Sequence, residues 1–199
     1  TFDNIYLEHI YYWTVTSLKR FFDSVSMQIL EVVPIDTHGG SIRVVVANRG
    51  HFTPGESIRV HLDEEAEQRL SIYSTYADFA QQVQKVRSDL VALINSLPNK
   101  VIIGYGAPAK STTLLNYCPM STALACIVDD SPLKQGKFTP GTHLPVISLD
   151  QAESFKPDYI LILAWNFAEP IMKKTQYLGA DYILPVPPRI IPCGKVEVS

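Results

Sequence analysis

The sequence lacks the features that would place it in a membrane or on nucleic acid. No apolar run approaches the length needed to span a bilayer, and the first ten residues, TFDNIYLEHI, have no basic flank before an apolar core. No block of basic residues occurs, and the formal net charge is -3. A basic surface patch is the usual electrostatic signature of nucleic-acid binding. We therefore expect neither a membrane partner nor a nucleic-acid partner.

Cysteine is also scarce. The chain has three cysteines, Cys118, Cys126 and Cys193, an odd number whose spacing matches no zinc-binding pattern. We expect reduced thiols, no bound zinc in this part of the protein and a cytoplasmic location. Internal repeats and low-complexity tracts are absent as well, which excludes a solenoid and favours an ordinary globular chain.

Residues 101–117 are the stretch around which the rest of the chain is arranged. Val101–Ile103 is a short apolar run typical of a buried parallel strand, and the turn GYG follows at 104–106. Residues 111–117 then have helical character. The first amides of such a helix lack internal partners, and the helix dipole and Lys110 add positive charge, so the turn favours an anion. The glycines are equally compatible with a tight turn that binds nothing.

The glycine turn matches the dinucleotide-binding fingerprint of a Rossmann fold. Gly104, Gly106 and Ala109 fit the pattern G-x-G-x-x-G/A. An aspartate pair at 129–130 ends the next apolar run, where an acid that binds ribose belongs. Pro108 weakens the match because it removes an amide donor from the loop.

Two other ligands fit the same turn. Gly104, Lys110 and Ser111 occupy the first glycine, the lysine and the hydroxyl positions of the P-loop pattern G-x-x-x-x-G-K-[ST]. Ala109 replaces the second glycine, and its Cβ would obstruct the approach of a phosphate to the backbone, which disfavours an NTPase. The third interpretation is a site for the diphosphate of a sugar nucleotide, with Lys110 as a point charge. The turn by itself leaves the three interpretations open.

Apolar runs and helical segments alternate from Val101 onward and predict the fold class. The later runs are 124–128, 146–148, 158–164 and 181–186, and helices are expected after Ser148 and over 169–178. This order predicts an α/β domain with a Rossmann-like, doubly wound parallel sheet. Ligands bind at the carboxyl ends of the strands in such sheets. Gly104, Asp129, Trp165 and Asn166 fall at those ends.

The first half of the chain is expected to be a helix, a β-hairpin and a long helical section. A helix is predicted over 16–23, and strands over 27–35 and 41–47 form an antiparallel hairpin around THGG. In the helical section, 56–97, apolar side chains recur at intervals of three and four and predict one continuous stripe packed against a core. The stripe consists of Tyr73, Tyr76, Phe79, Val83, Val86, Leu90, Leu93 and Leu97.

Several ordered blocks, taken together, resemble a known family. They read FDNIYLEH, HGGSIRV, VIIGYGAPAKSTTLLNYC, VDDSPLKQGKFTPGTHLPV and PDYILILAWNF. In this order they resemble the SAM-dependent C-methyltransferases that act on nucleotide-linked deoxysugars, over nearly the whole chain. The resemblance implies a methyl transfer to a carbon beside a keto group in deoxysugar biosynthesis, with this chain binding the nucleotide-diphosphate sugar.

The resemblance also implies how the chain is divided. Residues 1–55 would be the end of the methyltransferase domain, 56–97 a helical connector, and 98–199 a Rossmann-like C-terminal substrate-binding domain. S-adenosylmethionine would be bound by the protein's own N-terminal domain, because no second glycine-rich turn precedes residue 100. We therefore expect this chain alone to be inactive.

The family resemblance assigns the catalytic cluster to Tyr6, Glu8 and His9. Removal of a carbon-bound proton needs a base that titrates near neutral pH, which suits His9. Glu8 would orient that imidazole or hold a sugar hydroxyl, and Tyr6 would donate to the developing enolate oxygen. An aromatic-rich segment that only packs an interface is the alternative. The family carries histidine in place of Leu7, so a different substrate is expected if that histidine shapes the substrate site.

The remaining candidates are expected to contact the sugar nucleotide. The turn and helix supply Gly104, Tyr105, Gly106, Lys110 and Ser111, the next rim position supplies Trp165 and Asn166, and the hairpin supplies His38 and Arg43. Two other functions remain open: a non-catalytic nucleotide-binding module that regulates a partner, and an NAD-binding oxidoreductase domain built on the glycine turn.

Overall fold

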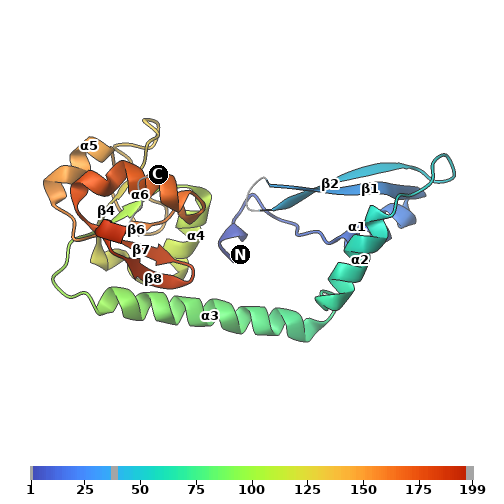
Figure 1. The fold of residues 1–199 in the computed structure, drawn as a ribbon, viewed down its shortest axis with the longest axis horizontal. Coiled ribbons are helices and arrows are strands. Elements are labelled where there is room, and N and C mark those ends of the chain that lie inside the picture. Colours follow the sequence, from blue (N-terminus) through green and yellow to red (C-terminus); the bar gives the residue numbers. More distant parts are fainter. Residues whose placement is uncertain (1, 37–39, 196–199) are drawn as a thin grey trace. The chain divides into compact units, whose positions relative to one another are not determined.

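The computed structural model describes residues 2–36 and 40–195 and divides the chain into two compact units. Unit 1 contains the residues up to His9 and from Gln81 onward, and unit 2 is Ile10–Ala80. Figure 1 labels most of the helices and strands of both units. The division falls within the long helix α3 (Tyr73–Asn95), so each unit is described by itself.

Unit 1 contains a six-stranded sheet in the order β5-β4-β3-β6-β7-β8. Its strands are β3 (Ile102–Tyr105), β4 (Leu124–Val128), β5 (Val146–Ile147), β6 (Tyr159–Ile162), β7 (Asp181–Pro185) and β8 (Pro188–Ile191). The first five are parallel, and β8 pairs antiparallel with β7. Numbered within the domain, this is the order 3-2-1-4-5-6 of a doubly wound fold. The predicted parallel α/β sheet is confirmed, whereas β8 was not expected.

Helices cover both faces of this sheet (Figure 1). The C-terminal half of α3 and α4 (Ala109–Tyr117) pack on one face, and α5 (Leu149–Ala152) and α6 (Ala168–Thr175) pack on the other. Successive side chains of β3 divide between the two cores: Ile102 joins one and Ile103 the other. Strands buried on both faces explain why the sequence shows continuous apolar runs rather than alternation.

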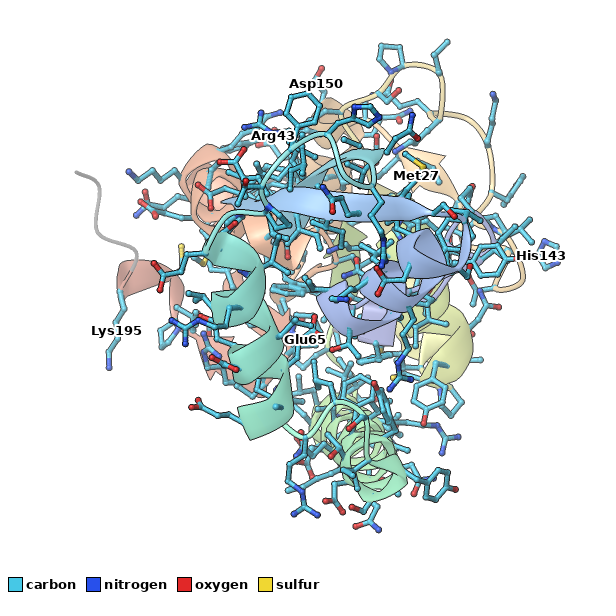
Figure 2. All side chains as sticks on the ribbon, turned by 90° about the vertical axis from the view of Figure 1, so that its right-hand side faces the viewer. Met27, Arg43, Glu65, His143, Asp150 and Lys195 are labelled. Carbon is cyan, nitrogen blue, oxygen red and sulfur yellow. The ribbon has the colours of Figure 1, made fainter. Side chains whose placement is uncertain are left out.

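Unit 2 is a hairpin packed on two helices. Strands β1 (Met27–Ile35) and β2 (Ser41–Asn48) pair antiparallel, as predicted. Their helices are α1 (Val15–Ser24) and α2 (Ser57–Glu67). Glu65 of α2, labelled in Figure 2, accepts hydrogen bonds from the amides of Val15 and Thr16 at 2.5 and 2.8 Å. A carboxylate there complements the positive end of the helix dipole of α1.

The predicted apolar stripe is wrong for the first half of its length. The helical section is two helices, and Tyr73, Tyr76 and Phe79 at the start of α3 are exposed. Leu90 and Ile94 near its end are buried against the sheet of unit 1. The heptad-like spacing is the same throughout, but only the last turns of α3 have a sheet to pack against within their own unit.

Candidate functional site

The N-terminal segment of the chain is anchored on the β-sheet domain of unit 1. Residues Phe2–Asn4 form a 3-10 turn, and the ring of Phe2 is buried with its centroid 5.6 Å from that of Tyr117. Asp3 is 2% exposed, and its Oδ2 accepts a hydrogen bond of 2.7 Å from the indole nitrogen of Trp165. The segment that carries the predicted catalytic cluster is therefore held at the carboxyl end of β6.

Tyr6 and His9 form a hydrogen-bonded pair. His9 Nδ1 lies 2.9 Å from the carbonyl oxygen of Asn4, and His9 Nε2 lies 3.0 Å from the hydroxyl oxygen of Tyr6. A carbonyl can only accept, so Nδ1 must carry the hydrogen and Nε2 must hold the lone pair in the neutral ring. Tyr6 then donates to Nε2. The geometry leaves the basic nitrogen of His9 on the side of Tyr6.

Glu8 does not take part in this pair. Within the described residues it makes no hydrogen bond or ion pair, and both Leu7 and Glu8 are exposed. The Asn4 carbonyl, and not Glu8, orients the imidazole. A role of Glu8 in holding a sugar hydroxyl stays a prediction.

Both glycines of the turn are required by packing. A Cβ on Gly104 would lie 2.4 Å from Ile127 Cδ1 inside the sheet, where the residue is buried. Gly106 has φ +98°, and a Cβ there would lie 2.7 Å from the Cβ of Ala164. Gly104 thus lets β3 pack closely against Ile127 of β4, and Gly106 lets the turn pack against Ala164 after β6, which accounts for both glycines without a ligand.

The backbone amides and the carboxylate that could contact a dinucleotide at this turn are already hydrogen-bonded within the chain. The amide of Gly106 donates to the Val128 carbonyl at 2.7 Å, and the amide of Ala107 donates to Asp129 Oδ2 at 2.7 Å. Asp129 also accepts from the amide of Ser131 and pairs with Lys134 at 3.1 Å. It is therefore a structural support of the loop rather than an open ribose acceptor. The pyrophosphate and ribose contacts of an NAD-binding turn are therefore not available at these groups.

The start of α4 is the remaining polar feature of the turn. The amides of Ala109 and Lys110 meet no backbone acceptor in the described part of the chain. Lys110 places its ammonium nitrogen 5.5 Å from the centroid of the Trp165 ring, within the range of a cation–π contact. Ser111 is buried, and its hydroxyl donates to the Pro108 carbonyl at 2.6 Å. The strand order reverses between β3 and β6, so Lys110 and Trp165 flank the position where such sheets bind ligands.

Tyr105 faces a different pocket of unit 1. Its hydroxyl donates to Asp130 Oδ1 at 2.9 Å, and Lys174 pairs with the same oxygen at 2.5 Å. The pKa of Tyr105 is raised to about 12, mainly by burial and further by the hydrogen bond to the Asp130 carboxylate. The phenol is therefore neutral at physiological pH. These side chains line a pocket of about 390 Å³ at the ends of β3, β4 and β6. The sequence indicated Tyr105 but no signal there indicated Lys174.

The hairpin candidates lie in unit 2 or outside the described residues. Arg43 is exposed on β2, where Figure 2 labels it. His38 lies outside the described residues. Asn166 is exposed beside Trp165 in the 3-10 turn Trp165–Phe167.

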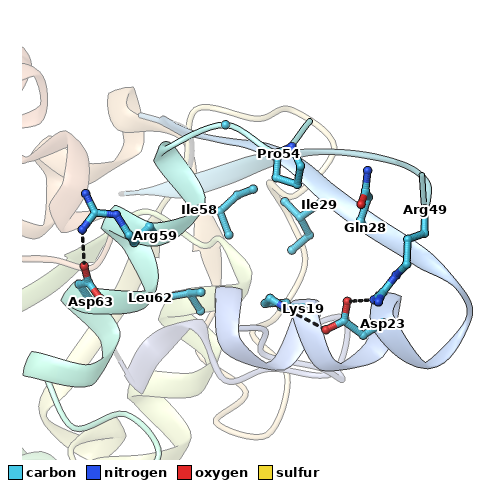
Figure 3. A pocket seen from close by; sticks show the side chains of 11 residues that line it. Lys19, Asp23, Gln28, Ile29, Arg49, Pro54, Ile58, Arg59, Leu62 and Asp63 are labelled. Atoms are coloured by element: carbon cyan, nitrogen blue, oxygen red, sulfur yellow. Dashed lines mark hydrogen bonds and ion pairs between the residues drawn. The ribbon is translucent and has the colours of Figure 1, made fainter. Parts of the chain in front are cut away.

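Unit 2 contains a pocket that the sequence did not indicate. Figure 3 shows it, about 430 Å³ in volume, between α1, β1 and α2. Ile29, Ile58 and Leu62 form its apolar side. Asp23 pairs there with Lys19 at 2.6 Å and Arg49 at 2.5 Å. The charges around the pocket thus largely neutralise one another.

Neither a metal-binding cluster nor a membrane-spanning helix occurs among the described residues. Across 2–36 and 40–195, no group of three or more His, Cys, Asp or Glu side chains could hold a metal ion. None of the helices in those ranges is both long enough and apolar enough to cross a membrane.

Comparisons with known proteins agree on one family. The family model described as "C-methyltransferase C-terminal domain" matches residues 36–187. The chain is also similar to the curated protein C-methyltransferase NovU of Streptomyces niveus, with 35% identity over 198 residues. That alignment covers 96% of this chain and 47% of the relative, so the chain spans about half the length of the curated relative it matches.

Proposed function

Because the chain belongs to the C-methyltransferase C-terminal domain family, we propose that it is the substrate-binding part of a SAM-dependent C-methyltransferase. The substrate is a nucleotide-linked deoxysugar, methylated on a carbon beside a keto group. One observation carries the proposal: the Tyr6–His9 pair lies on a segment anchored to Trp165, whose ring also holds Lys110. A base and a cation for a diphosphate thus share one end of the sheet.

His9 is proposed as the general base. With Nδ1–H held by the Asn4 carbonyl, Nε2 is the nitrogen that takes the proton from the substrate carbon. The electron pair of the broken C–H bond moves into the enolate. Tyr6, released from Nε2 when the substrate enters, donates to the enolate oxygen. SAM, held by a part of the full-length enzyme outside this chain, supplies the methyl group to that carbon.

The diphosphate is proposed to bind at the start of α4. The amides of Ala109 and Lys110 and the positive end of the helix dipole lie there, and the Lys110 ammonium adds a cation over the Trp165 ring. Trp165 offers a flat apolar face beside them for the base or the sugar ring. Contacts from Asn166, Arg43 and His38 to the same substrate stay predictions. Residues 1–55 are proposed as the end of the methyltransferase domain, 56–97 as a connector and 98–199 as the substrate-binding domain.

The proposal is tested by proton exchange in the full-length enzyme. Deuterium wash-in at the acidic sugar carbon is followed by mass spectrometry with SAM omitted, for the parent and for His9→Asn. Loss of a positioned base lowers the rate by about a hundredfold to ten-thousandfold, while nucleotide-sugar affinity is retained. His51→Asn, the same change at an exposed histidine of unit 2, is the matched control. Exchange at the parental rate in His9→Asn would reject His9 as the base.

Binding by this chain alone gives a second test. A thermal-shift panel of NAD, ATP, SAM and sugar nucleotides measures which ligand raises the melting temperature. We expect a shift with the sugar nucleotide and none with NAD or SAM. Stabilisation by NAD would instead support the oxidoreductase alternative.

A further inference from the structure

We propose that Asp3 is a positioning residue for His9, acting through its hydrogen bond to the indole nitrogen of Trp165. This inference rests on the proposed function, since it concerns how the base is held. It assigns a role to a residue that contacts neither the imidazole nor Lys110 directly. The residues that carry it all lie in unit 1.

The first argument is the energetic cost of Asp3. Its Oδ2 accepts from Trp165 Nε1 at 2.7 Å, but its Oδ1 is enclosed and has no hydrogen-bond partner among residues 2–36 and 40–195. A buried polar atom without a partner lowers the stability of the fold. Asp3 thus has one oxygen bonded to the indole and one that lowers stability, so stability alone does not account for an acid at this position. Residues that cost stability in this way are candidates for a functional role.

The second argument is the short covalent path from Asp3 to the imidazole. The carbonyl of Asn4, the next residue, is the group that holds His9 Nδ1 at 2.9 Å. The intervening backbone is closed by turns, with the Tyr6 amide donating to the Asn4 carbonyl at 3.1 Å and the His9 amide to the Tyr6 carbonyl at 2.9 Å. A displacement of Asp3 therefore moves the acceptor that fixes both the tautomer and the direction of the ring.

The third argument concerns Trp165, the donor of the hydrogen bond to Asp3. Trp165 follows β6 directly, and its ring carries the Lys110 ammonium at 5.5 Å. The indole thus touches the proposed phosphate cation with its face and the anchor of the base with its N–H. Through Trp165 and Asp3, the position of His9 is set relative to the position of Lys110. Misplacement of a reacting group by about 1 Å can cost on the order of a hundredfold in rate.

The test uses four variants of the full-length enzyme. Trp165→Phe keeps an aromatic ring beside Lys110 but removes the indole N–H. Asp3→Ala removes the acceptor, and Asp3→Asn keeps an acceptor for the indole while removing the charge. Trp13→Phe, the same change at the exposed tryptophan of unit 2, is the matched control. The measurements are SAM-free deuterium exchange, kcat and KM for the sugar nucleotide, and the melting temperature.

A positioning role for Asp3 predicts that the exchange rate and kcat fall while KM changes little. Trp165→Phe and Asp3→Ala lower the exchange rate and kcat by about tenfold to a hundredfold, with KM changed less than about threefold. Asp3→Asn retains most of the parental rate, and Trp13→Phe retains all of it. The melting temperature falls in Asp3→Ala, because the indole N–H of Trp165 loses its acceptor, and stays nearer the parental value in Asp3→Asn.

Three outcomes would overturn the inference. Parental exchange in Trp165→Phe would do so, and so would a loss in Asp3→Asn as large as that in Asp3→Ala. A fall in melting temperature with unchanged kcat would assign the bond to stability alone. These failures are distinct from failure of the proposed function, which would appear as exchange that survives His9→Asn.

Discussion

The two units of the chain bury their apolar side chains very differently. Unit 1 encloses its sheet between helices, and the side chains at the centre of β3, β6 and β7 have almost no exposure. Unit 2 has a small core around Val15, Ile29, Val32 and Ile58. Its hairpin leaves Ile35, Ile42 and Val45 more than a third exposed, which is unusual for strand residues of this type. A two-stranded hairpin is marginally stable by itself.

This difference indicates that the more extensive core and the proposed chemistry belong to the same unit, unit 1. The proposed base and phosphate site are built on unit 1, whose rigid sheet can hold side chains to the tolerance that catalysis needs. The hairpin of unit 2 has the apolar residues typical of strands, but its unit lacks enough packed neighbours to bury all of them. Substitutions of the same kind should therefore have unequal effects in the two units.

The largest contrast is expected between two isoleucines. Ile160→Ala in β6 removes a fully buried side chain and should lower the free energy of unfolding of unit 1 by about 2–5 kcal/mol. Ile42→Ala in β2, 37% exposed, should cost unit 2 less than about 1 kcal/mol. Urea unfolding followed by single-tryptophan fluorescence, with Trp165 for unit 1 and Trp13 for unit 2, separates the two transitions. Equal losses would contradict the comparison.

A second contrast concerns two glycines with positive φ. Gly106→Ala places a Cβ 2.7 Å from Ala164 Cβ and 3.1 Å from its backbone nitrogen, so the sheet must move. We expect a loss of about 2–3 kcal/mol, close to that of an overpacked core. Gly40→Ala has φ +119° but meets nothing within 4 Å, so backbone strain alone should cost about 1 kcal/mol. The unfolding free energies are measured as above, and a reversed order would refute this account.

Binding offers a smaller contrast between two cations. Lys110→Ala in unit 1 should weaken binding of a nucleoside diphosphate by about 1 kcal/mol at low salt, or roughly fivefold in Kd. The effect should shrink as salt is added, because screening removes charge–charge attraction. Lys19→Ala in unit 2 is the control and should leave Kd unchanged, since Lys19 is paired with Asp23. Isothermal titration calorimetry at two salt concentrations measures both, and equal Kd values for Lys110→Ala and the parent would reject this site.

The smallest contrast is a pH effect on two exposed ion pairs. Hydrogen bonding to Lys174 lowers the pKa of Asp130 in unit 1, and hydrogen bonding to Lys19 lowers the pKa of Asp23 in unit 2. A lowered folded-state pKa gives stability that is present above the unfolded value and is lost as the pH falls through the folded value.

Asp130→Asn should therefore remove a contribution of less than about 1 kcal/mol at neutral pH, after allowance for solvent screening, and a smaller one at pH 2. Asp23→Asn should show the same sign. Unfolding free energies are compared at pH 7 and pH 2. A loss that is larger at pH 2 than at pH 7 would show that the sign is wrong.

Local sequence patterns were sufficient for most of the elements. The hairpin strands begin and end within a residue of the predicted positions, and the helix before Pro98 ends at Asn95. Ser148 and Gln151 form the capping box expected of a serine followed by glutamine three residues later. Periodicity, caps and turns depend on neighbours in the chain, so one sequence reveals them.

Candidate site residues were predictable only one by one. The family resemblance indicated Tyr6 and His9, whereas Lys110 and Trp165 were indicated by their places in the αβ pattern. Nothing local indicated that the acid needed for the anchor was Asp3, that Asp129 supports the turn, or that Tyr105 faces Asp130 and Lys174. A polar side chain has the same appearance in the sequence whether its partner is a ligand or another loop.

The sequence by itself determined the order of strands and helices, the doubly wound class and the membership in the family. The tertiary structure decided which half of α3 is buried, that β8 turns back along β7, and that Asp3 meets Trp165 across 162 residues of chain. The physical reason is that helix and strand periods are set by spacing within a few residues. Contacts between distant residues depend on how the sheet brings their backbones together. No pattern within a few residues of the chain specifies that arrangement.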